Sequence, residues 1–163
     1  MFVARLATIG CITGLSCLGY WAAAQAQGTG CQFQSVTGLN FGSYDPFSPI
    51  PLDITGQVQF VCVGGGAGSF NNRPVTVQLS QGGSNSFTPR QMSSGSDRLN
   101  YNLYLDANRS IIWGDGTGGT QQRGPFIPGN NVLNTLMIYG RIPAQQWVAP
   151  GLYTDSLRVT IIF

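Results

Sequence analysis

The chain has 163 residues and a mass of 17.4 kDa, about the length of one domain. Its eight basic residues are all Arg and its six acidic residues are all Asp, so Lys, Glu and His are absent. Without His, Ser-His-Asp and Cys-His catalysis and imidazole-based metal sites are excluded. A net charge of +2 spread over isolated arginines is not typical of a nucleic-acid-binding protein. Charged residues make up only 9% of the chain, which disfavours surface helices built on Glu–Lys pairs.

The first 26 residues are typical of a signal peptide. Residues 1–5 form a short positive start, residues 6–21 are mostly apolar, and Ala24-Gln25-Ala26 matches the small-x-small pattern of a signal-peptidase site. We expect cleavage after Ala26, which leaves residues 27–163 as one secreted domain without a stable membrane span. An uncleaved membrane anchor is the alternative, but Gly, Thr and Ser interrupt the apolar stretch.

The cysteine count depends on this cleavage. Cys11 and Cys17 leave with the signal peptide, whereas Cys31 and Cys62 remain. Lipid modification of Cys11 or Cys17 is disfavoured because neither has the expected Leu three residues earlier. Two cysteines in an exported chain predict one disulfide, Cys31–Cys62, rather than a metal site.

Apolar residues of the mature chain recur with a period of two, which predicts strands with one buried face. The clearest candidates are residues 57–62, 75–80 and 99–105. A turn at residues 106–109 precedes a further strand at 110–113. Residues 132–139 predict a strand buried on both faces, and residues 153–163 predict one final strand.

Gly- and Pro-rich runs separate these strands and indicate turns; they cover residues 45–51, 64–72, 81–95, 114–119 and 143–151. About seven short strands at this spacing predict an all-β, immunoglobulin-like β-sandwich, because each strand must bury one face against a second sheet.

Three stretches are candidate catalytic or binding sites, and each is better explained as a turn or a loop. The stretch that begins at Asp106 starts like a calcium loop but lacks the Gly and Glu that the loop needs. The run Asp115-Gly116-Thr117 lacks the residue order and the second copy of an aspartic protease. Residues 64–68 are Gly-rich without the Lys of a phosphate loop. We therefore expect no enzyme activity and no cofactor, while the polar and aromatic surface leaves sugar contact open.

Several stretches occur in a characteristic order along residues 31–163. The most specific is a turn whose motif residues are Trp113, Gly114, Asp115, Gly116, Thr117, Gly119 and Thr120. The others are residues 99–106, 139–144 and 150–155, together with Cys31, residues 39–42 and Cys62. In this order they resemble the spore coat protein U family. That family includes a developmental spore coat protein and secreted subunits of archaic chaperone-usher pili, which mediate attachment and biofilm formation.

The resemblance implies an incomplete immunoglobulin fold that lacks its last strand. In such pilin domains a groove beside the C-terminal strand receives a strand from a periplasmic chaperone and later, at the outer-membrane usher, from another pilus subunit. The alternation of Leu157, Val159, Ile161 and Phe163 suits the wall of that groove. The terminal carboxylate of Phe163 is the group that such a chaperone would anchor. The alternative is that these residues form the last strand of a closed sandwich.

The chain departs from the family pattern at its N-terminus. Polymerising subunits carry an apolar donor segment before the first Cys, whereas cleavage after Ala26 leaves only residues 27–30. The expectation is an acceptor-only subunit at the tip of a cell-surface fibre. The alternative function is a free-standing secreted coat or carbohydrate-binding domain that does not polymerise. Neighbouring chaperone and usher genes would favour the first hypothesis.

Overall fold

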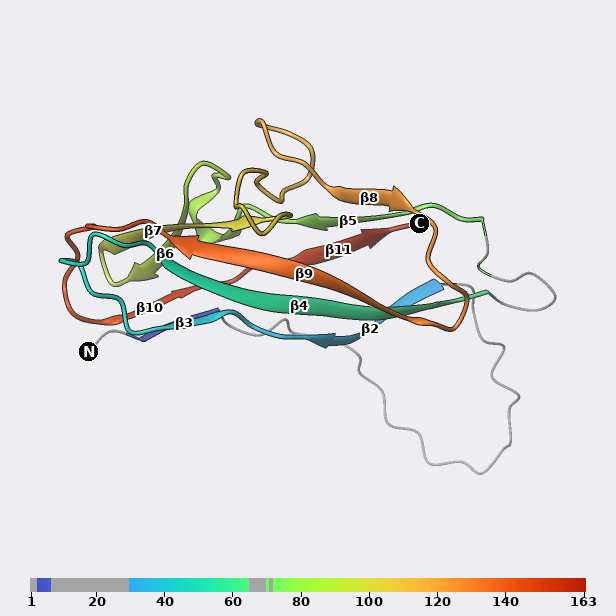
Figure 1. Ribbon diagram of the computed structural model, residues 1–163, viewed down its shortest axis with the longest axis horizontal. Helices are drawn as coiled ribbons and strands as arrows, with labels where there is room; N and C mark the ends of the chain where they lie inside the picture. Colours follow the sequence, from blue (N-terminus) through green and yellow to red (C-terminus); the bar gives the residue numbers. More distant parts are fainter. Residues whose placement is uncertain (1–2, 7–29, 65–69, 71) are drawn as a thin grey trace, which may run out of the picture.

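The computed structural model describes residues 3–6, 30–64, 70 and 72–163, and it shows an all-β protein, as the sequence predicts (Figure 1). The described part contains eleven strands rather than about seven, and one short 3-10 turn, Gly82–Ser84. The strands are β1 Val3–Leu6, β2 Gly30–Val36, β3 Asn40–Gly42, β4 Leu52–Val63, β5 Val75–Leu79, β6 Arg90–Ser94, β7 Asp97–Tyr104, β8 Arg123–Phe126, β9 Leu133–Ile142, β10 Leu152–Asp155 and β11 Val159–Ile162. Within these ranges, no helix is long and apolar enough to span a membrane.

The strands form two sheets around one core. The larger sheet has the order β2-β4-β9-β7-β6-β10-β1-β3, and the smaller one has the order β11-β5-β8. Buried side chains of β4 alternate with half-buried ones, and those of β5 do the same. The buried set is Val58, Phe60, Cys62, Val75, Val77 and Leu79, so the predicted period of two is confirmed in both strands.

The strand β9 differs from its prediction. Leu136 and Ile138 are buried as expected, but Leu133 and Met137 are 52% and 38% exposed. The expectation of burial on both faces was wrong because no described element covers the outer face of β9. The apolar composition of this segment therefore leaves hydrophobic side chains in contact with solvent.

The C-terminal segment is two strands and not one. β10 joins the larger sheet and β11 joins the smaller one, so the chain changes sheets between residues 155 and 159. Asp155 holds the crossover, because its carboxylate accepts hydrogen bonds from Gly83 N at 2.8 Å, Ser156 N at 2.8 Å and the Tyr101 hydroxyl at 2.6 Å. At this point, hydrogen bonds from the backbone to the Asp155 side chain take the place of hydrogen bonds between strands.

Two further expectations need correction. Residues 110–113 make only isolated bridges, between Tyr104 and Ile112 and between Trp113 and Gln121, rather than a strand. The predicted turn at 81–95 contains the strand β6. The runs 45–51, 114–119 and 143–151 are free of named strands, as predicted.

Parts of two expectations lie outside the described residues. Residues 65–69 and 71 of the Gly-rich run belong there, and so do residues 1–2 and 7–26 of the expected signal peptide. Residues 3–6 form the backbone of β1, which runs parallel to β10 and antiparallel to β3.

Candidate strand-acceptor site

The last strand of the chain lies at the edge of the smaller sheet. β11 pairs with β5 in the register Val159 to Leu79 and Ile161 to Val77, and no second described strand pairs with it. Val159 and Ile161 are half-buried and pack against the core together with Leu157. Ile162 is 48% exposed. The expected alternation of half-buried and exposed side chains is therefore present in β11, which begins after the crossover.

Phe163 lies where β11 meets the start of β2. Its ring centroid is 5.7 Å from that of the fully buried Phe70, and its ring lies against Gly30. The ring remains 53% exposed. Phe163 therefore differs from Val159 and Ile161. It contacts Phe70 and Gly30 beyond the end of β11, whereas the other two pack against the core.

The strand β2 is the edge of the larger sheet and pairs only with β4 among the described strands. Cys31 and Cys62 lie directly opposite one another in this pair and form the predicted disulfide. Cys31 and Val36 are half-buried and pack against the core. The disulfide thus ties an edge strand, which has hydrogen bonds on one side only, to its neighbour β4.

The strand β1 occupies a position between β3 and β10. Residues 3–6 pair in parallel with residues 152–155, while Ala4 and Arg5 face Gly42 and Asn40 of β3. β2 and β3 are consecutive in the chain, and so are β10 and β11. We call the backbone edges of these four strands the acceptor edges. β1 lies between β3 and β10, and no described strand lies between β2 and β11.

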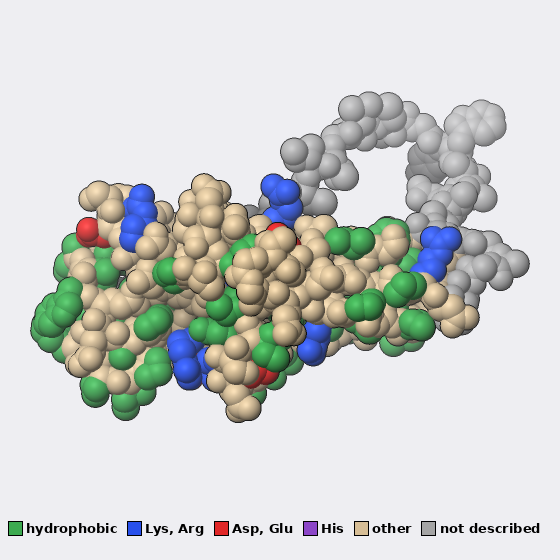
Figure 2. Space-filling view, turned by 90° about the horizontal axis from the view of Figure 1, so that it is seen from above, with side chains coloured by type: hydrophobic (Ala, Val, Ile, Leu, Met, Phe, Trp, Pro, Cys, Tyr) green, Lys and Arg blue, Asp and Glu red, His purple; other side chains and the backbone are tan. Residues whose placement is uncertain are grey.

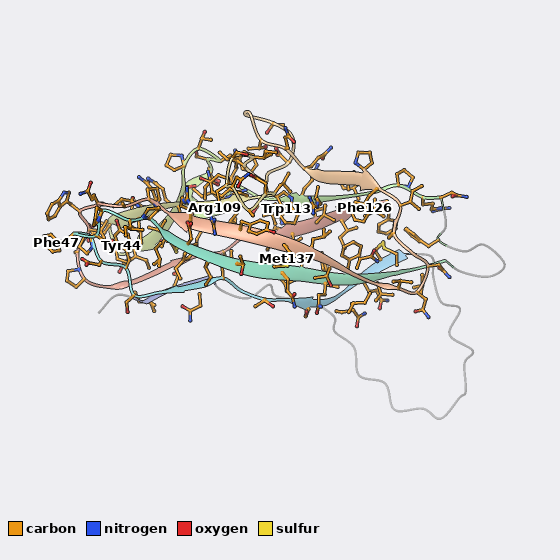
Figure 3. All side chains as sticks on the ribbon, viewed as in Figure 1. Tyr44, Phe47, Arg109, Trp113, Phe126 and Met137 are labelled. Atoms are coloured by element: carbon orange, nitrogen blue, oxygen red, sulfur yellow. A yellow bond between two sulfur atoms is a disulfide. The ribbon has the colours of Figure 1, made fainter. Side chains whose placement is uncertain are left out.

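The motif turn at 113–120 is a scaffold with an exposed tip. Trp113 is fully buried, and its indole Nε1 donates to Val77 O at 2.9 Å (Figure 3). Thr120 is also buried and donates to Thr117 O at 2.7 Å. Gly114 lies so close to the Thr120 side chain that a β carbon would collide with it. These contacts explain why large, small and hydroxyl-bearing residues must occur at this spacing.

Asp115 organises the tip of the same turn. Its Oδ1 accepts hydrogen bonds from Thr117 N at 2.9 Å and Thr117 Oγ1 at 2.6 Å. These bonds hold the pKa of the Asp115 carboxyl below its usual value. Gly116 and Gly119 have φ angles of 90° and 78°, which side-chain-bearing residues rarely adopt. Asp115 is thus a turn residue.

Asp106 has an equally structural role. Its carboxylate accepts hydrogen bonds from Ser110 N, Ser110 Oγ and Ile111 N at 2.8 to 3.2 Å. Across the described residues, no group of three or more His, Cys, Asp or Glu is placed to hold a metal ion.

Arg90 is a buried charge that no sequence pattern singles out. Its side chain is fully buried and donates to Ser80 O at 3.0 Å, Asn102 Oδ1 at 2.7 Å and Trp113 O at 2.6 Å. Burial lowers the pKa of Arg90 to about 10, so the guanidinium still carries its charge at neutral pH. Arg90 therefore joins β6, β7 and the motif turn, and it serves the scaffold that carries β11.

A family model and a known protein match this chain in sequence. The family model described as Spore Coat Protein U domain matches residues 19–160. A relative named Protein U from Myxococcus xanthus is 34% identical over 152 residues, which cover 83% of this chain and 79% of the relative.

A solved structure also matches. It is the crystal structure of the CsuC-CsuE chaperone-tip adhesion subunit pre-assembly complex from the archaic chaperone-usher Csu pili of Acinetobacter baumannii. The match has a TM-score of 0.49 and 20% sequence identity, and it covers 68% of this chain and 34% of the other. The match thus spans about a third of that longer chain.

Proposed function

Because the chain belongs to the Spore Coat Protein U domain family, we propose that it is a structural or adhesive subunit of an extracellular pilus or coat. In this proposal the subunit is assembled by chaperone-usher donor-strand complementation and contributes to attachment and biofilm formation. It is exported through the periplasm, where a chaperone binds it, and reaches the cell surface through an outer-membrane usher, where it meets other pilus subunits.

One observation carries the proposal: the position of β1 between β3 and β10. Cleavage after Ala26 would remove β1 and leave the facing edges of β3 and β10 without a partner. Unpaired edges are sites at which another chain can add a strand. The adjoining edges of β2 and β11 bear half-buried apolar side chains, including Val36, Val159 and Ile161, which a donated strand would cover.

The same cleavage sets the direction of assembly. Only residues 27–30 would precede Cys31, and these include two glycines. Such a segment is too short to donate a strand, so we propose that the mature chain accepts a strand and sits at the tip of its fibre. Sequencing the mature N-terminus tests this step, and a start upstream of Trp21 would contradict it.

The main test is expression of residues 27–163 with and without a periplasmic chaperone encoded beside the gene. We expect aggregation or proteolysis of the chain alone and a soluble one-to-one complex with the chaperone, because the acceptor edges expose apolar side chains until a strand covers them. A stable, folded monomer without any partner would contradict the proposal and favour the free-standing coat or carbohydrate-binding domain.

Two substitutions on β11 sharpen this test. Ile161 is half-buried and Thr160 is exposed, and both lie on the same strand. We expect Ile161→Asp to reduce chaperone capture at least tenfold and Thr160→Asp to leave it nearly unchanged, as measured by co-purification. Equal capture of both variants would show that the half-buried side of β11 does not meet the donated strand.

A further inference from the structure

The end of the molecule opposite Phe163 carries exposed aromatic side chains. Phe47 and Trp147 are 69% and 76% exposed, and Ile50 on the same loop as Phe47 is 70% exposed. Phe47 lies at the far left in Figure 3, whereas the C-terminus lies to the right in Figure 1. Figure 2 shows hydrophobic side chains gathered at the same left-hand end. A cluster of this kind on a protein surface commonly marks a site of interaction.

The aromatic pair is held in a defined geometry. The rings of Phe47 and Trp147 meet edge to face, with centroids 5.0 Å apart and an interplanar angle of 89°. The buried Tyr44 connects their two loops, because its hydroxyl donates to Pro143 O at 3.0 Å and accepts from Gln146 N at 2.7 Å. The two rings therefore form a platform that is ordered before any ligand arrives.

A shallow hollow of about 260 Å³ adjoins this platform. It is lined by Ser43, Tyr44, Asp45, Ser48, Ile50, Pro51 and Leu52. The lining contains hydroxyls, one carboxylate and apolar carbon, and none of these residues is basic. Asp45 Oδ1 accepts a hydrogen bond from Phe47 N at 2.9 Å, and Ser48 Oγ accepts one from Ile50 N at 3.2 Å. Both groups retain acceptor capacity toward a ligand.

We propose that Trp147, Phe47 and the adjoining hollow form a binding site for a neutral saccharide. A sugar ring has a face of C–H groups that can pack on the indole, and it has hydroxyls at its rim that can donate to Asp45 and Ser48. An acidic ligand would meet the Asp45 carboxylate at close range. A purely apolar surface would remove water from Asp45 and Ser48 without replacing their hydrogen bonds, which costs free energy.

The site is independent of the acceptor edges, since none of its residues belongs to β2, β3, β10 or β11. A saccharide contact on these loops would leave the backbone edges of the four strands free for strand donation. Saccharide binding and strand acceptance can therefore fail separately, and each has its own assay.

The test uses the full chain as secreted, applied to insoluble cellulose, chitin and mannan. We expect retention on at least one of these polysaccharides and release by soluble oligosaccharide of the same type. Trp147→Ala should weaken retention about tenfold, which corresponds to the loss of about 1.4 kcal/mol. Trp147→Tyr should keep most of the affinity because it restores a flat ring. The matched control is Ile127→Ala, which removes a side chain that is 59% exposed just after β8.

Tryptophan fluorescence gives a second measurement. Trp147 is exposed and Trp113 is fully buried, so a bound oligosaccharide should protect the fluorescence of Trp147 from acrylamide. That protection should be absent in Trp147→Tyr. Failure of all three polysaccharides to retain the chain would overturn the proposal. Equal retention of wild type and Trp147→Ala, or adsorption to polystyrene beads alone, would overturn it as well.

Discussion

At the scale of single residues, Arg90 determines how the motif turn is held. A buried guanidinium is costly unless its donors are satisfied, and here all three hydrogen bonds go to neutral acceptors, Ser80 O, Asn102 Oδ1 and Trp113 O. The centroid of the Phe87 ring lies 5.0 Å from the guanidinium carbon, and the ring adds a cation–π contact. The described part of the chain offers Arg90 no ion pair. Its role is to join backbone segments that are distant in sequence.

Arg90→Met should therefore lower the free energy of unfolding by about 3 kcal/mol, because it leaves buried carbonyl and amide oxygens without donors. Urea unfolding of the full chain, followed by the fluorescence of the buried Trp113, measures this change. Arg98→Met is the matched control, since Arg98 is exposed and should change stability by less than about 0.5 kcal/mol. Equal effects of the two substitutions would contradict the structural role of Arg90.

At the scale of elements, the edge strand β2 depends on a covalent link. β2 pairs on one side only with β4, and its register shifts between Phe33 and Ser35, so its ladder is weaker than that of the central strands. The disulfide joins Cys31 to Cys62 across this pair, over a sequence separation of 31. It holds one of the acceptor edges in place while the opposite edge of β2 stays open among the described strands.

Replacement of Cys31 and Cys62 by Ala should lower the free energy of unfolding by about 3 to 4 kcal/mol, because a loop of this length loses its constraint in the unfolded chain. Urea unfolding checks the value, and reduced wild-type protein should match the double variant. Hydrogen exchange of the β2 amides should also become faster. A loss below about 1 kcal/mol would show that β2 is held by packing alone.

At the scale of the whole molecule, the absence of His, Lys and Glu governs the response to pH. His is the residue type whose ordinary pKa lies between 5 and 8, and this chain has none. Its side-chain carboxylates are all Asp. A hydrogen bond from Arg141 lowers the pKa of Asp53, which lies in an ion pair at 2.7 Å with Arg141 and at 3.2 Å with Arg109. Folding thus favours the charged form of Asp53.

The free energy of unfolding should stay nearly constant from pH 5 to 8. Because the pKa of Asp53 is lower in the folded chain, its contribution is present above its unfolded pKa of about 3.9 and is lost as pH falls through the folded pKa. Asp53→Asn should cost less than about 1 kcal/mol at pH 7, since the pair is partly exposed, and the difference should shrink as the pH falls below about 3.9. Urea unfolding across this range provides the measurement. A change above about 1 kcal/mol between pH 5 and 8 would contradict the prediction.

The sequence predicts best where local pattern and burial coincide. In β4 and β5 the period of two was enough to place the buried face. In β7 it placed Leu99, Tyr101 and Leu103 correctly, but Asn102 on the opposite face is buried as well. The short strands β3 and β8 have three and four residues, too few for a period to emerge. For residues 153–163 the pattern was continuous, and it could not reveal that Asp155 binds Gly83 and divides the segment between two sheets.

The sequence by itself determined the all-β class, the disulfide and the family, because alternation, cysteine count and motif order are properties of the chain alone. Only the tertiary structure decided which edges lie open, which charge is buried and which aromatic rings meet. Phe47 and Trp147 are one hundred positions apart, and the Tyr44 hydroxyl reaches Gln146 over a separation of 102. Such contacts depend on how sheets stack and loops converge, and side-chain packing across those distances leaves no periodic signal in the sequence.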